Sequence, residues 1–208
     1  MIIQWCIKGL NLDDDAAARD IVDCRGGILC NWWRTVGRID TALRRERLTS
    51  ANLNVHVNHF TVIDPSCGKP FSTMTPFISL SAGTVERDAA ARTNLVHRAR
   101  RTALWFGTEF GRRSIAFLYL CWVVLAPRQA VEIEGVGEEV RDLNTYRRYS
   151  AFQTEGEVVA KIWIPDNQIR ACEKWTWDRS AHRLALDWCH PNQRFTPPER
   201  LSNVRELL

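Results

Sequence analysis

Five stretches of the chain carry the pattern of hydrophobic and polar positions that is typical of extended structure. They are rich in β-branched and aromatic side chains and bounded by Gly, Pro or polar residues, at 2–9, 53–63, 76–81, 114–126 and 157–164. The stretch at 114–126 is apolar on both faces, as in a strand that is covered on both sides. We therefore expect this strand at the centre of the core, and a strand or extended segment at 53–63.

Three stretches repeat their apolar positions at helical spacing. The first, about 16–22, follows N-cap candidates at 13–15, and the third, 89–106, follows Asp88 and ends at Gly107. The second runs from about Leu29 to Leu48. Its apolar face holds Trp32, Val36, Ile39 and Leu43, and its other face holds Arg38, Arg44, Arg45 and Arg47. We interpret the basic face as a solvated surface, with contact to a polyanion as the alternative.

The length of 208 residues fits one domain with a full core. We expect a single domain over 1–208, with a helical part at about 10–50 and a C-terminal tail at about 170–208. The tail could form a short helix at 179–188. Residues 128–150 are polar and predict a long connection, and long ordered connections within compact domains are often functional.

The composition is that of an ordinary globular protein, with 45% hydrophobic residues, 25% charged residues and nine Trp. The net charge of +4 permits an anionic ligand such as a dinucleotide or RNA, but does not demand one. The seven cysteines form no C-x-x-C pair, so the sequence predicts neither a disulfide framework nor a zinc site. We therefore expect no metal and a reducing cytoplasm as the location.

No membrane association is expected from the sequence. The first nine residues lack the layout of a signal peptide, and acidic residues follow at 13–15. The longest apolar run, from Ile115 to Ala126, is too short to span a bilayer.

Two carboxylates stand at the start of the last predicted strand. Glu155 and Glu157 are two residues apart, so in an extended chain their side chains point to the same side, about 6.5 to 7 Å apart along the backbone. One such carboxylate can stabilise a developing cation while the other takes a proton, as in the cleavage of glycosidic-type bonds. The alternative is a pair of solvated charges at a strand edge.

Ser79 and Ser81 share one face of the predicted strand at 76–81, and buried hydroxyls need hydrogen-bond partners. His56 and His59 are three residues apart, which suits a metal site only on a helix. In an extended segment they face opposite ways. We therefore expect packing or hydrogen-bonding roles for both histidines, with His59 the better candidate for facing a pocket.

The order of these motifs resembles that of the mono-ADP-ribosyltransferase toxins of the Arg-Ser-Glu class. Phe77-Ile-Ser79-Leu-Ser81 looks like the family's aromatic-x-S-T-S strand with Leu in place of its Thr, and Glu155-Gly-Glu157-Val-Val looks like its E-x-E motif. The resemblance spans about residues 76–165. It implies an α+β fold, a split β-sandwich with N-terminal helices around an NAD cleft.

One position departs from the family pattern. The family's first strand carries an arginine that grips the NAD phosphates, and the corresponding place here reads Trp5-Cys6-Ile7-Lys8-Gly9. Cys6 stands where the arginine is expected. Lys8 could replace the arginine as a point charge without bidentate geometry, and Arg25 or Arg34 could also reach the phosphates.

The resemblance implies NAD as a substrate. It makes Glu157 the catalytic glutamate, Ser79 the residue that positions it, and Glu155 the residue that orients or deprotonates the acceptor. Residues implied to bind NAD are Lys8, Trp5, Ser81, His59, Phe77 and Tyr149. Tyr146, Tyr149 and Phe152 could stack on nicotinamide or recognise the target, or simply pack on the core.

The implied function is transfer of ADP-ribose to a macromolecule, either protein or nucleic acid, by a toxin or effector. An antitoxin or immunity protein is a candidate partner, and the cytoplasm in which the protein acts could be that of a target cell. Two alternatives remain open. One is an NAD glycohydrolase on the same fold, and the other is a binding module that has lost catalysis.

Overall fold

The computed structural model describes residues 2–24, 26–37, 46–82, 92–125, 136–139, 157–198 and 204–205. Its largest group of strands is built on β1 (Ile2–Leu10) and β6 (Ile115–Leu125), and the whole of β1 pairs antiparallel with β6. On the other side of β6 lies β10 (Ile169–Asp178), which pairs with β11 (Arg183–Pro191). The short strand β12 (Val204–Arg205) lies parallel to β1. The predicted central strand at 114–126 is therefore confirmed as β6.

A second group of strands joins the first at only a few residues. It consists of β5 (Phe77–Ser81), β8 (Glu157–Lys161) and β7 (Val136–Glu139), paired antiparallel in that order. Ile7 of β1 pairs with Ser81, and the end of β6 pairs with the start of β7. The sheet thus splits into two parts, as expected for a split β-sandwich.

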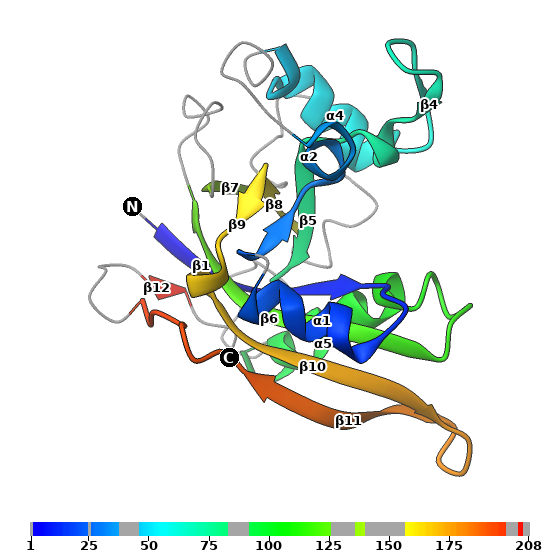
Figure 1. Cartoon of the computed structure of the whole chain (residues 1–208), viewed down its shortest axis with the longest axis vertical. Coiled ribbons are helices and arrows are strands. Elements are labelled where there is room, and N and C mark those ends of the chain that lie inside the picture. The colour runs from blue at the N-terminus through cyan, green and yellow to red at the C-terminus, as the bar shows by residue number, and fades with distance from the viewer. Residues whose placement is uncertain are drawn as a thin grey trace.

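Helices cover both faces of the β1–β6–β10 group (Figure 1). Helix α1 (Asp15–Asp23) packs on the face that presents Cys6 and Tyr119, and α5 (Arg92–Gly107) packs on the face that presents Ile7 and Leu118. The carboxylate of Asp14 caps α1 by accepting a hydrogen bond from the Ala17 amide, as the acidic run at 13–15 predicts.

The remaining elements lie around β5. Helices α2 (Asn31–Val36) and α4 (Ser50–Asn58) lie near one end of β5 in Figure 1. Strand β2 (Ile28–Leu29) pairs with β9 (Trp163–Ile164), and β3 (Ile63–Asp64) pairs with β4 (Lys69–Pro70). Two short 3₁₀ turns complete the described part, η1 (Phe71–Thr73) and η5 (Asp166–Gln168).

The strand or extended segment predicted at 53–63 is wrong, because most of this stretch is the helix α4. Thr49 caps the helix by accepting a hydrogen bond from the Asn52 amide, and Leu53 and Val57, four residues apart, are both buried. The alternation of β-branched residues fitted a strand equally well. The cap and the i, i+4 pair were the signals for a helix.

Two other helix predictions need correction. The helix predicted from Leu29 to Leu48 is interrupted, because Leu29 belongs to β2 and α2 ends before Gly37, whose φ of 67° suits a glycine. Val36, predicted for its apolar face, is 41% exposed, and residues 38–45 lie outside the described residues. The helix suggested at 179–188 is also wrong, since this region forms the β10–β11 hairpin.

The strand predicted at 157–164 is broken at Ile162. This buried residue has a φ of 63°, a strained value for a β-branched side chain, and it separates β8 from β9. Its amide donates to Pro76 O, and its carbonyl accepts from the Cys30 amide. These hydrogen bonds tie the end of β8 to the segments that precede β5 and α2.

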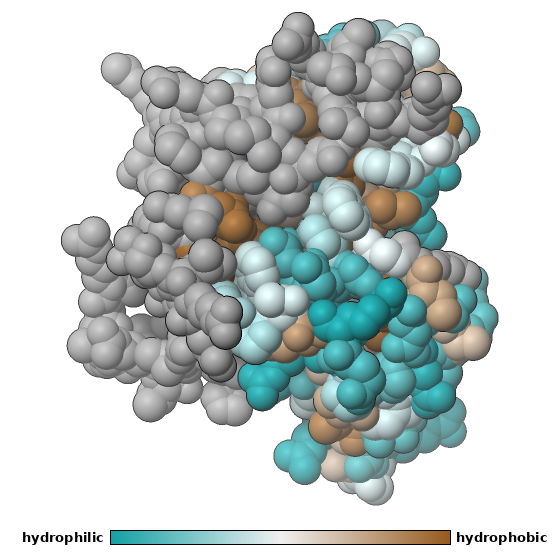
Figure 2. Space-filling model, turned by 60° about the vertical axis from the view of Figure 1, so that its left-hand side comes forward, coloured by the Kyte–Doolittle hydropathy of each residue, from teal (hydrophilic) through white to brown (hydrophobic). Residues whose placement is uncertain are grey.

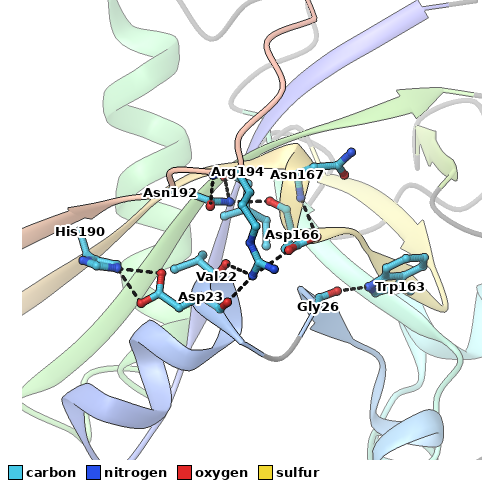
Figure 3. A network of polar contacts seen from close by, with 10 residues as sticks. Val22, Asp23, Gly26, Trp163, Asp166, Asn167, His190, Asn192 and Arg194 are labelled. Atoms are coloured by element: carbon cyan, nitrogen blue, oxygen red, sulfur yellow. Dashed lines mark hydrogen bonds and ion pairs between the residues drawn. The ribbon is translucent and has the colours of Figure 1, made fainter.

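A polar network ties the C-terminal segment to the end of α1 (Figure 3). Arg194 donates to the carbonyls of Val22 and Asp23 and forms an ion pair with Asp166. The side chain of Asp23 also accepts from His190 at 2.9 Å. The network therefore holds the turn between α1 and β2 against the segment that follows β9.

Hydrophilic side chains cover most of the described surface in the centre of Figure 2, and the hydrophobic patches on this face are small and separate. Within the residues that the structure describes, no helix is both long enough and apolar enough to cross a membrane.

Candidate functional site

A cavity of about 560 Å³ lies between the two groups of strands, within the range of small-molecule sites. Strands β1, β5 and β8 contribute to its wall, together with helices α2, α4 and α5. Polar and charged side chains that line it include Lys8, Arg34, His56, Ser79, Ser81 and Glu157. Residues distant in the sequence therefore meet in one concave site.

Ser79 and Glu157 are joined directly in this cavity. The Ser79 hydroxyl donates to Glu157 Oε1 at 2.8 Å. Strand register places Ser81 opposite Glu157 and Ser79 opposite Val159, so both serines and Glu157 share the face of β5–β8 that lines the cavity. The hydrogen bond restricts the rotamers of the carboxylate and orients it.

His56 continues this arrangement on the other side of Ser79. Its Nε2 lies 2.8 Å from Ser79 Oγ, and its Nδ1 lies 2.9 Å from Thr75 Oγ1. Because the Ser79 proton goes to Glu157, the hydroxyl must accept from Nε2–H, and Nδ1 must then accept from the hydroxyl of Thr75. Thr75 Oγ1 in turn accepts from the Phe77 amide. The four side chains form one directed chain of hydrogen bonds that ends at the carboxylate.

The imidazole of His56 is neutral over the physiological range. Burial is the main cause that lowers its pKa, to about 3, and the positive charge of Lys8 acts in the same direction. A neutral ring fits the hydrogen bonds, because its Nε2–H donates to Ser79 while its Nδ1 accepts from Thr75. His56 therefore positions Ser79 and is no acid or base at neutral pH.

Lys8 of β1 lines the same cavity and interacts electrostatically with both His56 and Glu157. Burial lowers its pKa to about 8, while the charge of Glu157 opposes the shift. Its ammonium group is therefore mostly protonated at neutral pH and loses its proton in mildly alkaline solution. A second cation, Arg34 of α2, also lines the cavity.

Two glycines allow backbone segments in the wall of the cavity to approach each other closely. A Cβ on Gly9 would lie 2.0 Å from Ala103 O, so only glycine lets α5 approach β1 beside Lys8. Gly27 has a φ of 103°, and a Cβ there would lie 2.0 Å from Ile164 O. Both glycines line the cavity, so the close approach of these elements shapes the site.

The structure brings several of the sequence-predicted residues together, namely Ser79, Ser81, Glu157, Lys8 and Phe77, which all line the cavity. Trp5 is absent from the cavity lining and packs on Phe195. Cys6 is fully buried in the core.

His59 also lies elsewhere, exposed at the C-terminal end of α4 and absent from the cavity lining. The prediction that His59 faces a pocket is therefore wrong, because it assumed an extended segment. Within a helix, His56 is the histidine that turns inward. Glu155, Tyr149, Tyr146, Phe152 and Arg25 lie outside the described residues.

Thr75 is a residue of this site that the sequence analysis missed, whereas His56, expected to pack or form hydrogen bonds, does form them. A helix capped by Thr49 places His56 three residues after the buried Leu53, on the same face of the helix, and this cap was visible in the sequence. In the described part of the chain, no three His, Cys, Asp or Glu side chains gather as a metal site.

Comparison with solved structures identifies the fold. The structure named EcPltA matches with a TM-score of 0.51 and 16% identity, over 97% of this chain and 90% of that chain. Two mutants of the heat-labile enterotoxin, one of them from E. coli, match with TM-scores of 0.46 and 0.47, at 16% and 15% identity, over 97% of this chain and 82% and 83% of theirs.

No family model and no curated protein sequence matches the chain. The EcPltA match shows the α+β fold of ADP-ribosyltransferase toxins, as the sequence motifs predict.

Proposed function

We propose that this protein is an NAD-dependent ADP-ribosyltransferase that modifies a macromolecular target, and that it acts as a toxin or effector. The observation that carries the proposal is the hydrogen bond from Ser79 to Glu157 in the wall of the cavity. The toxin-like fold is a second line of support. The hydrogen bond involves two residues of the sequence motifs, whereas the structural match extends over 97% of the chain.

Glu157 would supply negative charge where positive charge develops. Breaking the bond between nicotinamide and ribose leaves an oxocarbenium-like cation on the ribose, and a carboxylate stabilises this cation more than it stabilises the neutral ribose. If the carboxylate also accepts a hydrogen bond from a ribose hydroxyl, that hydrogen bond becomes stronger as the cation forms. Its orientation therefore matters as much as its charge.

Ser79 and His56 would keep that orientation fixed. Ser79 uses its proton for Glu157 and His56 uses Nε2–H for Ser79, so neither side chain needs to reorganise during the reaction. Preorganisation of this kind lowers the barrier without any proton transfer by the histidine. Both are positioning residues.

Lys8 would hold the pyrophosphate of NAD in place of the family's arginine. An ammonium group is a single point charge, so it attracts phosphate without the two parallel hydrogen bonds of a guanidinium. Lys8 is close enough to Glu157 for the carboxylate to influence the pKa of the lysine. This closeness suits a ligand whose anionic part is adjacent to its reacting part. Glu155 would orient or deprotonate the acceptor.

The proposal is tested with NAD that carries its label in the adenylate phosphate. Purified protein is incubated with this NAD and a cell lysate, and the label is followed in protein, in nucleic acid and in free ADP-ribose. Label on a macromolecule, absent with Glu157→Gln, is the expected result. Nuclease and protease treatment of the labelled fraction then distinguishes a nucleic-acid acceptor from a protein acceptor.

Two other results would contradict the proposal. Label found only in free ADP-ribose with every lysate would indicate an NAD glycohydrolase. No consumption of NAD, together with no thermal shift on adding NAD, would indicate a binding module that has lost catalysis.

A further inference from the structure

We propose that Phe106 and Phe110, at one end of the cavity, form the subsite for the purine ring of the dinucleotide. This inference rests on the proposed use of NAD. Both side chains line the cavity, although Phe106 is 37% exposed and Phe110 is 45% exposed. Aromatic side chains that are half open to solvent and line a cavity offer a face on which a flat ring can stack.

The position of this pair along the cavity follows from β1. Ile7 pairs with Ser81, and Ser81 pairs with Glu157, so the carboxylate lies level with Ile7. Lys8 comes next. Gly9 and Leu10 then lie against Gly107 at the end of α5. The approach is close: a Cβ on Gly107 would lie 3.5 Å from both Gly9 Cα and Leu10 N.

Followed along the backbone of β1, the lining therefore runs from the level of the Glu157 carboxylate, through the cation Lys8, to the apolar residues beside the end of α5. Leu10 and Leu12 line that end together with the two phenylalanines. NAD has the same order of parts: a ribose that becomes cationic, an anionic pyrophosphate and a purine. With strands rising about 3.3 Å per residue, Lys8 and Leu10 are separated by roughly 6.6 Å, about the span of a ribose. The match in order is what assigns the purine to the aromatic end.

The backbone at Phe110 is held in an unfavourable conformation. Glu109 and Phe110 have φ values of 51° and 63°, in a region that bulky residues rarely adopt. Hydrogen bonds maintain the turn: the Phe110 amide donates to Trp105 O, and the Gly111 amide donates to Thr108 Oγ1. Strain of this kind persists mainly where the position of a side chain serves a function.

The aromatic rings also brace one another. Phe110 makes edge contacts with Phe106, at 5.4 Å between ring centroids, and with Trp105, at 6.0 Å. Phe110 is therefore presented to the cavity in a fixed orientation, and a ring that is fixed beforehand loses little freedom when a ligand binds.

The test measures binding of AMP and of nicotinamide mononucleotide, which are the two halves of NAD, by titration calorimetry. AMP should bind about tenfold more weakly to the Phe110→Ala and Phe106→Ala proteins than to wild type, because loss of one stacking ring typically has this effect. Binding of nicotinamide mononucleotide should not change. Phe110→Tyr, which keeps the ring, should restore AMP binding.

Trp177→Ala, at an exposed aromatic residue of β10 outside the cavity lining, is the matched control and should bind both halves as wild type does. Thermal unfolding confirms that each variant is folded. Unchanged AMP binding in the folded Phe110→Ala protein, or equal loss of both halves, would overturn this inference alone. Wild-type protein that binds neither AMP nor NAD would contradict the proposed function as well.

Discussion

The hydroxyl of Ser79 donates a 2.8 Å hydrogen bond to the carboxylate of Glu157, which lies 78 positions further along the chain. The two residues belong to adjacent antiparallel strands, and His56 holds the serine from its other side at 2.8 Å. A carboxylate in the wall of the cavity is thereby fixed in one orientation before any ligand enters.

Replacing Ser79 by alanine should lower kcat for nicotinamide release by about a hundredfold and change KM for NAD little. The carboxylate of Glu157 keeps its charge but loses its orientation, and small misplacements of a catalytic group have effects of this size. Steady-state kinetics with NAD measure both constants. Thr73→Ala, which removes an exposed hydroxyl on η1, is the control. A Ser79→Ala enzyme with unchanged kcat would show that the hydrogen bond has no positioning role.

Replacing His56 by alanine should lower kcat but leave the shape of the pH profile between pH 5 and 8 unchanged. Because the pKa of His56 is lowered to about 3, wild-type His56 is already neutral throughout this range. The kinetics of wild type and variant across pH provide the check. A protonation step near pH 6.5 that disappears in His56→Ala would mean that the imidazole titrates and acts as an acid or base.

Activity at low NAD concentration should fall as the pH rises through about 8. Lysine is charged below its pKa, and burial lowers the pKa of Lys8 to about 8, so the attraction for pyrophosphate is present at neutral pH and lost above it. The pH profile of kcat/KM reports groups of the free enzyme and therefore measures this step.

Lys8→Arg should move the alkaline fall to higher pH, because arginine keeps its charge, and Lys8→Met should lower kcat/KM at all pH values. The account of Lys8 would be wrong if Lys8→Met bound NAD as tightly as wild type at pH 7.

Gly27→Ala should destabilise the fold more strongly than Gly26→Ala. Both glycines have positive φ, but a Cβ at position 27 would meet Ile164 O at 2.0 Å whereas one at position 26 has open space around it. We expect a loss of about 1 kcal/mol in the free energy of unfolding for Gly26→Ala and clearly more for Gly27→Ala. Urea denaturation of the two proteins measures the difference. Equal losses would contradict the close approach of β2 and β9.

Glu155→Ala should spare hydrolysis of NAD and weaken transfer to the acceptor, whereas Glu157→Gln should abolish both. The reason is the proposed division of roles, in which Glu157 stabilises the cation and Glu155 prepares the acceptor. Free ADP-ribose and labelled acceptor are measured in the same reaction. Indistinguishable behaviour of the two variants would refute the division.

Expression of the wild-type gene should reduce colony counts in a susceptible host relative to Glu157→Gln. Western blots must show equal amounts of the two proteins. Equal colony counts at equal expression would count against a toxin whose target is present in that host.

Much of the sheet could be predicted from the sequence because its strands are dense in β-branched and aromatic residues. The apolar run that forms β6 and the motif residues Ser79 and Glu157 were identified in this way. The pairing that joins Ser79 to Glu157 could only be expected through the resemblance to a known family, since local patterns carry no information on which strands are neighbours.

The errors arose where local signals were ambiguous. Residues 53–63 alternate like a strand, yet the cap at Thr49 and the burial of Leu53 and Val57 favour a helix. Residues 179–188 resembled a short helix, but the pairing of β11 with β10 outweighs their weak helical pattern. The break at Ile162 is imposed by backbone hydrogen bonds from distant segments, so no local pattern predicts it.

The most direct test of the central claim is the rate of nicotinamide release from NAD by wild-type protein and by Glu157→Gln, with Glu46→Gln as a control at an exposed glutamate. We predict release by wild type and by Glu46→Gln at the same rate, and at least a hundredfold slower release by Glu157→Gln, whose amide keeps the shape of the carboxylate but lacks its charge. Release by Glu157→Gln at the wild-type rate would contradict the account.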